Sequence, residues 1–264
     1  MEALHITSTQ NPRIKSLVAL QQKASERRSK GMFVVEGVRE VEHCIESGFE
    51  IKEIYYSPNP TFHIAEGNID GASMIEVSKQ VYEKIAYRGS TEGIVAVVKE
   101  KNLGMEDLSL PDNPLIVVVE SVEKPGNLGA ILRSADAAGV DAVIVCDPLT
   151  DLYNPNLIRS SIGARFTVQC VACTSDECIA FLKARNIQIL TAQLQDSSLY
   201  YDTDMKRPTA IVMGTEATGL TDKWRDAADK HIRIPMLGKL DSLNVSVSAA
   251  ILMYEAVRQR TTST

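Results

Sequence analysis

The chain lacks the features that would place it in a membrane or a secretory pathway. No apolar run approaches the roughly 20 residues that a membrane span needs, and the first five residues show no signal-peptide pattern. These absences make the cytoplasm the expected compartment. The chain has five cysteines, an odd number that cannot all pair, and it shows no secretory signal. Both observations indicate reduced thiols rather than disulfides.

Two nucleotide-binding fingerprints are also missing. Neither G-x-G-x-x-G nor G-x-x-x-x-G-K-[ST] occurs among the 264 residues, so the sequence does not favour a dinucleotide-dependent oxidoreductase or a P-loop enzyme. Only four histidines are present, and their scattered positions suggest no Ser-His-Asp arrangement.

A metal site is not predicted. The nearest pattern is Cys170-x-x-Cys173-x-x-x-x-Cys178, but a structural zinc site takes four ligands. The sequence offers neither a second pair at a matching spacing nor a histidine nearby. Cys170 is instead expected to face the core of a strand.

The composition that remains is that of a folded protein. A hydrophobic content of 44% supports a core, and the length suits two domains. A net charge of −6 argues mildly against nucleic-acid binding. Residues 11–30 nevertheless carry six basic side chains against Glu26 alone. This charge by itself is equally consistent with a solvated helix face and with a local RNA footprint.

Residues 1–100 are predicted to form a small α/β domain. The pattern favours helices over residues 12–22, 37–47 and 77–86, and strands over residues 32–36, 51–56 and 93–98. Asn11 can cap the first helix ahead of Pro12. Residues 101–113 are polar, contain Gly104 and Pro111, and are predicted to be a linker; the alternative is a surface loop within one larger domain.

From residue 115 strands and helices alternate. Strands are predicted at residues 115–119, 142–146, 167–171, 187–192, 209–213 and 231–234. Their nearly continuous Val and Ile content indicates burial on both faces, hence a mainly parallel sheet covered by helices on both sides. Helices are predicted over residues 128–138 and 245–260. The second is apolar along Val247, Ile251, Tyr254 and Val257.

Three polar blocks follow these strands, and the carboxyl edge of such a sheet is where ligands bind. They are Asn127-Leu-Gly-Ala-Ile-Leu-Arg133, Gly214-Thr-Glu-Ala-Thr-Gly-Leu220, and Ile234-Pro-Met236 with Ser242-Leu-Asn244. Structural explanations are available for each block: Asn127 as a helix cap, Ser242 or Asn244 as the N-cap of the last helix, and the glycine-rich block as a plain turn.

The three blocks, in this order, resemble the SpoU/TrmH family of RNA ribose 2′-O-methyltransferases, within the knotted SPOUT class. Asn11-Pro-Arg-Ile-Lys15, Phe33-Val-Val-Glu-Gly37 and Gly93-Ile-Val-Ala-Val97 are similar to that family's substrate-binding domain. The fold of that domain is shared with RNA-binding ribosomal proteins. The resemblance implies an RNA-binding domain at residues 1–100 and a methyltransferase domain with a deep trefoil knot at residues 114–264.

The resemblance also implies S-adenosylmethionine as cofactor and a homodimer whose active site draws on both subunits. The positions that match cofactor contacts are Gly214, Glu216, Gly219, Ile234, Met236 and Leu243. Those that match catalysis or substrate placement are Asn127, Arg133, Glu216, Ser242 and Asn244. The basic residues expected to meet RNA are Arg13, Lys15, Arg27, Arg28 and Lys30.

The implied reaction suits these residue types. Methyl transfer from a sulfonium requires alignment of the reactants and loss of the hydroxyl proton. Arginine is effectively never deprotonated, so Arg133 is expected to orient the hydroxyl and stabilise developing alkoxide charge. The ribosomal-protein type of the first domain favours large-subunit (23S) rRNA by analogy. The alternatives are a tRNA ribose methyltransferase, a base methyltransferase of the same class, and a non-catalytic RNA-binding protein.

Overall fold

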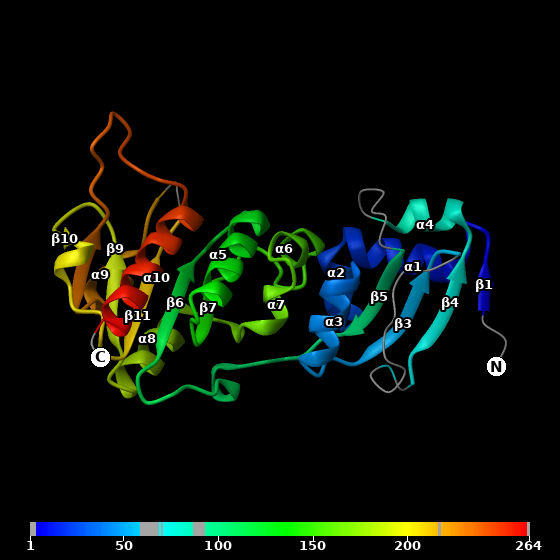
Figure 1. Cartoon of the computed structure of the whole chain (residues 1–264), viewed down its shortest axis with the longest axis horizontal. Helices are drawn as coiled ribbons and strands as arrows, with labels where there is room; N and C mark the ends of the chain where they lie inside the picture. The colour runs from blue at the N-terminus through cyan, green and yellow to red at the C-terminus, as the bar shows by residue number, and fades with distance from the viewer. Residues whose placement is uncertain (1–3, 59–68, 70, 87–92, 216–217, 263–264) are drawn as a thin grey trace. The chain divides into compact units, whose positions relative to one another are not determined.

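The computed structural model describes residues 4–58, 69, 71–86, 93–215 and 218–262 (Figure 1). The chain divides into two compact units. The first comprises residues 1–102 and 151–167, and the second comprises residues 103–150 and 168–264. Residues 151–167, which lie inside the predicted domain of residues 114–264, therefore pack with the N-terminal unit. None of the helices in the described part of the chain combines the length and apolarity needed to cross a bilayer.

The first unit is built on a mixed five-stranded sheet in the order β1-β4-β3-β5-β2. Strand β5 runs antiparallel to both β2 and β3, whereas β4 runs parallel to β3 and β1. The elements of this unit, in chain order, are β1 (Leu4–Ile6), α1 (Pro12–Gln22), α2 (Ala24–Lys30), β2 (Met32–Glu36), α3 (Val38–Glu46), β3 (Ile51–Tyr56), β4 (Ser73–Val77), α4 (Lys79–Ile85), β5 (Ile94–Lys99), α6 (Pro155–Ser160) and α7 (Ala164–Thr167).

Each face of this sheet has its own apolar core. On one face Ile14, Leu17 and Ile85 from α1 and α4 pack against the sheet. On the other face the core includes Phe33 together with Tyr153 and Phe166, which belong to the segment of residues 151–167. The rings of Phe33 and Tyr153 stack with centroids 4.3 Å apart. These aromatic contacts account for the packing of residues 151–167 with the N-terminal unit.

The second unit contains a parallel seven-stranded sheet in the order β10-β12-β9-β11-β6-β7-β8. Its elements are η2 (Met105–Asp107), β6 (Leu115–Glu120), α5 (Pro125–Ala137), β7 (Ala142–Cys146), β8 (Cys170–Cys173), α8 (Ser175–Ala184), β9 (Gln188–Ala192), β10 (Ser198–Leu199), η3 (Tyr200–Asp202), β11 (Thr209–Met213), α9 (Asp222–Ala227), β12 (Lys230–Arg233) and α10 (Val245–Thr261). The predicted parallel sheet is confirmed.

Helices cover both faces of this sheet. Helices α5 and α10 lie side by side on one face (Figure 1). On the other face Cys178 and Leu182 of α8 and Trp224 of α9 pack against alternate residues of the central strands. Every residue of β6 is buried, as expected for a central strand covered on both sides.

The structure differs locally from the sequence-based expectations. Strand β4 was not predicted, and the strand expected at residues 167–171 is β8 at Cys170–Cys173, because Thr167 ends helix α7. The apolar stripe predicted for the last helix is not buried: Val247 is 46% and Tyr254 is 50% accessible, and Ile251 and Val257 are only partly buried. Helix α10 instead packs on the sheet through its other side, with Ala249, Leu252, Met253 and Ala256.

Candidate active site

The first polar block begins helix α5 at the carboxyl end of β6. Lys124 is the N-cap and Pro125 is the first helical residue, a position at which its missing N–H is no loss. Asn127 is therefore the third residue of the helix, and its backbone N–H donates to the Lys124 carbonyl. The interpretation of Asn127 as the cap of this helix is therefore wrong.

The third block begins helix α10, and Asn244 is its N-cap. The Asn244 Oδ1 accepts hydrogen bonds from the backbone N–H of Ser246 at 3.0 Å and from its Oγ at 2.6 Å. The Asn244 Nδ2 donates to Asn127 Oδ1 at 3.2 Å. One side chain thus both caps α10 and joins the first and third blocks, which are 117 residues apart in the sequence.

A pocket lies beside the third block, at the carboxyl ends of β9 and β12. Four residues expected at the site line it: Ile234, Met236, Ser242 and Leu243. Sequence reasoning missed the remaining wall, which consists of Ala192, Gln193, Leu194, Ile232, Arg233, Asp241 and Ser248. The sequence signal that could have identified Gln193 and Leu194 was their position directly after the predicted strand of residues 187–192, which corresponds to β9. Mostly apolar walls with a few polar groups are typical of a small-molecule site.

The second block folds back on itself. Thr215 and Gly219 exchange two backbone hydrogen bonds of 3.3 and 3.1 Å. A Cβ at Gly214 would overlap the backbone of Gly219, and Gly219 itself has a φ of +70°, a conformation that favours glycine. Both glycines are therefore required for this close approach. Glu216, expected to serve both cofactor and catalysis, lies outside the described residues.

Buried Glu120, at the end of β6, anchors the segment that follows this block. Its carboxylate accepts from the Thr221 backbone N–H at 2.9 Å and from Thr221 Oγ1 at 2.7 Å, and Ser175 Oγ, which donates to Asp147 at 2.6 Å, shares its hydrogen with Glu120 Oε1 at 3.1 Å. The available sequence signal was the position of Glu120 directly after the predicted strand of residues 115–119. Glu120 holds β6, α8 and the start of α9 together through these hydrogen bonds.

Arg133 projects from the exposed side of α5. It lies six residues beyond Asn127, about 9 Å along the helix axis, and none of the described residues forms a hydrogen bond or ion pair with it. Ser242 is also exposed and donates to Asp241 Oδ1 at 3.2 Å. Within one chain, the structure joins Asn127 to Asn244 but does not join Arg133 to either.

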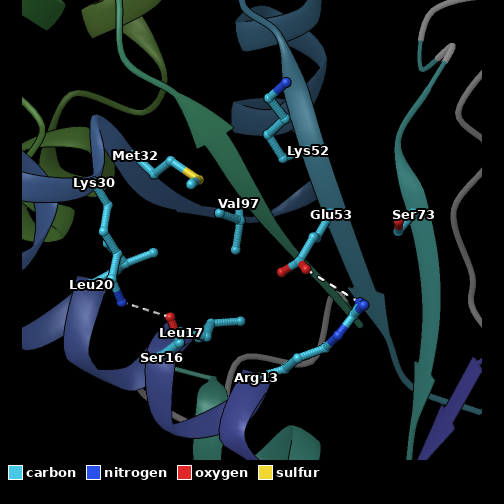
Figure 2. A pocket seen from close by; sticks show the side chains of 10 residues that line it. All are labelled: Arg13, Ser16, Leu17, Leu20, Lys30, Met32, Lys52, Glu53, Ser73 and Val97. Carbon is cyan, nitrogen blue, oxygen red and sulfur yellow. Dashed lines mark hydrogen bonds and ion pairs between the residues drawn. The ribbon is translucent and has the colours of Figure 1, made fainter.

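In the first unit a pocket gathers basic side chains from α1, α2 and β3. Figure 2 shows Arg13, Lys30 and Lys52 around it, with Arg13 Nη1 3.3 Å from Glu53 Oε1 and Lys30 Nζ 2.9 Å from Ser16 Oγ. Sequence reasoning missed Lys52, which occupies a solvent-facing position of β3. The other predicted RNA contacts Lys15 and Arg28 are exposed on α1 and α2.

Arg27 differs from the other four basic residues expected to meet RNA. Its side chain is 3% exposed, and its Nε lies 2.5 Å from Asp151 Oδ2. Its Nη1 donates to the Leu20 carbonyl at 2.6 Å. A guanidinium enclosed in this way cannot present itself to a phosphate, so the expectation that Arg27 contacts RNA is corrected to a structural role.

Two family profiles match the chain. The profile of the SpoU rRNA Methylase family matches residues 114–254. The profile of the MRM3-like substrate binding domain matches residues 11–96. The first match includes all three polar blocks, and the second includes the basic helices.

Full-length relatives are similar to both parts of the chain. The 23S rRNA (guanosine-2′-O-)-methyltransferase RlmB of Bordetella pertussis is 35% identical over 84% of this chain and 94% of its own length. The 23S rRNA (guanosine(2553)-2′-O)-methyltransferase RlmP of Bacillus subtilis is 28% identical over 94% of this chain and 97% of its own. An AdoMet-bound rRNA methyltransferase from Sinorhizobium meliloti superposes with a TM-score of 0.89 at 28% identity, covering 98% of each chain.

Proposed function

The chain belongs to the SpoU rRNA methylase family, and we propose that it transfers the methyl group of S-adenosylmethionine to a ribose 2′-hydroxyl of 23S rRNA. The observation that carries this proposal is the hydrogen bond between Asn127 and Asn244 beside the pocket of Ile234, Met236 and Leu243. Relatives named for this reaction on 23S rRNA cover both parts of the chain.

The pocket residues suit the proposed cofactor. Ile234, Met236 and Leu243 provide apolar contact for an adenine ring, and Gly214 and Gly219 bring backbone close to a ligand without side-chain bulk. The residue roles at this pocket, including that of Glu216, are part of the proposal. When bound, S-adenosylmethionine supplies an activated methyl group on a sulfonium.

The protein's task is to place the hydroxyl and to stabilise the charge that develops on it. We assign this task to Arg133, whose guanidinium stays protonated and offers several donors to an oxyanion or a phosphate. Asn127 and Asn244 would hold the ribose, with Ser242 at the pocket rim. The exposed position of Arg133 on α5 leaves it able to reach an RNA or a second subunit.

We further propose a homodimer with an active site drawn from both subunits. The exposed side of α10 supports this proposal, because Val247 and Tyr254 there are about half accessible and Leu243 precedes them at the helix start. An apolar helix side left open in a monomer is typical of an interface. The same proposal includes the expected domain roles: residues 1–100 bind the substrate, residues 101–113 are a linker, and residues 114–264 form the catalytic domain with a trefoil knot. It also includes a cytoplasmic location.

Two alternatives make different predictions. A tRNA methyltransferase would modify tRNA riboses, and a non-catalytic relative would bind RNA without transferring a methyl group. The relatives that match over nearly the whole chain favour 23S rRNA.

Mapping of ribose methylation in total RNA, with and without the gene, tests the proposed substrate. The expected result is one 23S rRNA ribose that loses its methyl group in the absence of the protein and regains it when the purified protein and S-adenosylmethionine are added. A change confined to tRNA would contradict the substrate. Binding of S-adenosylmethionine without methyl transfer to any RNA would contradict the enzyme.

A further inference from the structure

Three cysteine thiols converge on the α8 side of the second sheet. Cys146 ends β7, Cys173 ends β8, and Cys178 lies in the first turns of α8. Their sulfurs all lie within 4.8 Å of one another, and those of Cys146 and Cys173 are 4.0 Å apart. No disulfide joins them. The methyl-transfer reaction proposed above makes no use of this cluster.

The geometry of the sheet selects these three thiols and excludes Cys170. Residues along a strand point alternately to opposite faces. Val171 and Cys173 therefore share the α8 face with Cys146, which is the direct neighbour of Cys173 in the parallel pairing of β7 and β8. Cys170 lies three positions before Cys173 and points to the opposite face. The sequence spacing Cys170-x-x-Cys173 suggests that these two thiols are neighbours, but the thiol next to Cys173 is that of Cys146 on the adjacent strand.

The spacing of the sulfurs fits a single soft ion. Three sulfurs placed about 2.3 Å from a metal in a trigonal arrangement are about 4 Å apart. The Cys146–Cys173 separation already has this value, and Cys178 needs only a small side-chain adjustment. Cys173 is half-buried on the edge strand β8, which provides a path by which an ion can enter.

The donor set identifies the kind of ion. Thiolates select soft metals such as Cu(I) and Zn(II), but structural zinc takes four ligands. Among the described residues, the metal-ligating group contains three cysteines only. The nearby carboxylate of Asp147 is engaged by Ser175, whose Oγ and backbone N–H donate to its Oδ2 at 2.6 and 3.2 Å. Three thiolates without a fourth ligand suit Cu(I).

The charge near the cluster also favours a cation. The carboxylates of Glu177 and Asp147 lie near the Cys173 sulfur and place negative charge beside the cluster.

We propose that Cys146, Cys173 and Cys178 form a three-coordinate site for Cu(I). Binding forms three copper–sulfur bonds and displaces the thiol protons to solvent, with no change in oxidation state. The ion would fasten β7, β8 and the start of α8 together on the side of the sheet opposite α5 and α10. The proposal does not depend on the methyltransferase activity.

Anaerobic titration of the full, reduced chain with Cu(I) tests this site, using a chromophoric Cu(I) chelator as competitor. One tightly bound ion per chain is expected, with X-ray absorption giving three sulfur neighbours at about 2.3 Å. Cys173→Ser, at the half-buried position, should weaken binding at least 100-fold. Cys170→Ser, on the same strand but the opposite face, is the matched control and should bind within threefold of the parent.

Equal binding by the Cys173→Ser and parent proteins would overturn the proposal, as would an equal loss in Cys170→Ser. A parallel titration with Zn(II) alone should give weaker binding than Cu(I), and tighter zinc binding would overturn the assignment to copper. Near-ultraviolet circular dichroism of each variant shows whether it is folded. If Cys173→Ser does not fold, loss of one bound ion in Cys178→Ala carries the same test.

Discussion

Asn244 donates a hydrogen bond to Asn127 across 117 residues of sequence while its own Oδ1 caps helix α10. The donated bond fixes the start of α10 against the start of α5. The cap satisfies backbone N–H groups that a helix start otherwise leaves unpaired. Because the two roles use different atoms of one amide, substitutions can separate them.

Asn244→Ser should keep the cap and lose the contact with Asn127, because serine caps helices well but its side chain is shorter. We expect stability within about 0.5 kcal/mol of the parent, since capping by serine and asparagine is nearly equivalent. Methyl transfer should fall at least tenfold. Asn244→Ala should lose the same activity and also about 0.5–2 kcal/mol of stability. Urea unfolding measures the stability of each variant, and a methylation assay measures its activity. Full activity in Asn127→Ala would contradict the proposed role of the contact between Asn127 and Asn244.

Arg133→Ala should leave the fold intact and remove most of the activity. The side chain is exposed and forms no hydrogen bond or ion pair with any of the described residues, so stability should stay within about 0.5 kcal/mol. The loss of charge stabilisation should reduce kcat by about 100-fold. Cofactor affinity, measured by calorimetry, should be unchanged. Arg133→Lys keeps the charge without the planar fork and should recover only part of the rate; a parent rate in Arg133→Ala would remove Arg133 from the mechanism.

Two substitutions in helix α2 should have different effects: Arg27→Ala should lower stability, and Lys30→Ala should weaken RNA binding. Removing Arg27 leaves Asp151 without its partner in a largely buried pair, which should cost about 3–5 kcal/mol. Lys30 is exposed, so its removal should barely change stability. It should weaken RNA binding and reduce the slope of log K against log[salt] by up to about 0.9. Urea unfolding and filter binding at several salt concentrations check both, and an unchanged salt slope in Lys30→Ala would contradict the proposed interface.

Tyr254→Asp should convert a dimer into a folded monomer. Tyr254 is exposed on α10 beside Val247, and a charge placed within an apolar interface is not compensated. Sedimentation velocity should show half the parent mass, with an unchanged circular dichroism spectrum. Lys183→Asp, on the exposed surface of α8, is the control and should stay dimeric. A monomeric parent protein would refute the proposed homodimer outright.

Glu255→Gln should destabilise the protein more at neutral pH than in acid. Hydrogen bonds from Arg258 lower the pKa of Glu255 below its ordinary value of 4.5. A lowered pKa in the folded state gives stability that is present above the ordinary pKa and is lost as pH falls through the folded-state pKa. Because Arg258 is largely exposed, about 0.5–1 kcal/mol is expected. Urea unfolding should show this difference at pH 7, and the difference should shrink as the pH is lowered below 4.5.

Much of the fold could be predicted from periodicity alone. Val117 and Val119 belong to a short run of β-branched residues, and such runs indicate strands buried on both sides. The predicted helix of residues 12–22 coincides with α1, because Asn11 and Pro12 mark its start unambiguously. Strand β4 escaped prediction since its Ser73-Met-Ile-Glu-Val77 sequence is too short and mixed to stand out.

By itself, the sequence determined the parallel sheet, its polar blocks and the family, because these depend on local patterns of residue type. Only the tertiary structure decided that Arg27 is enclosed, that Tyr153 and Phe166 belong to the N-terminal core, and that Cys146 rather than Cys170 faces Cys173. Each of these depends on which distant segments meet and on which face of an element a side chain emerges. Sequence spacing cannot specify partners from other strands, because their register is set by packing of the whole sheet.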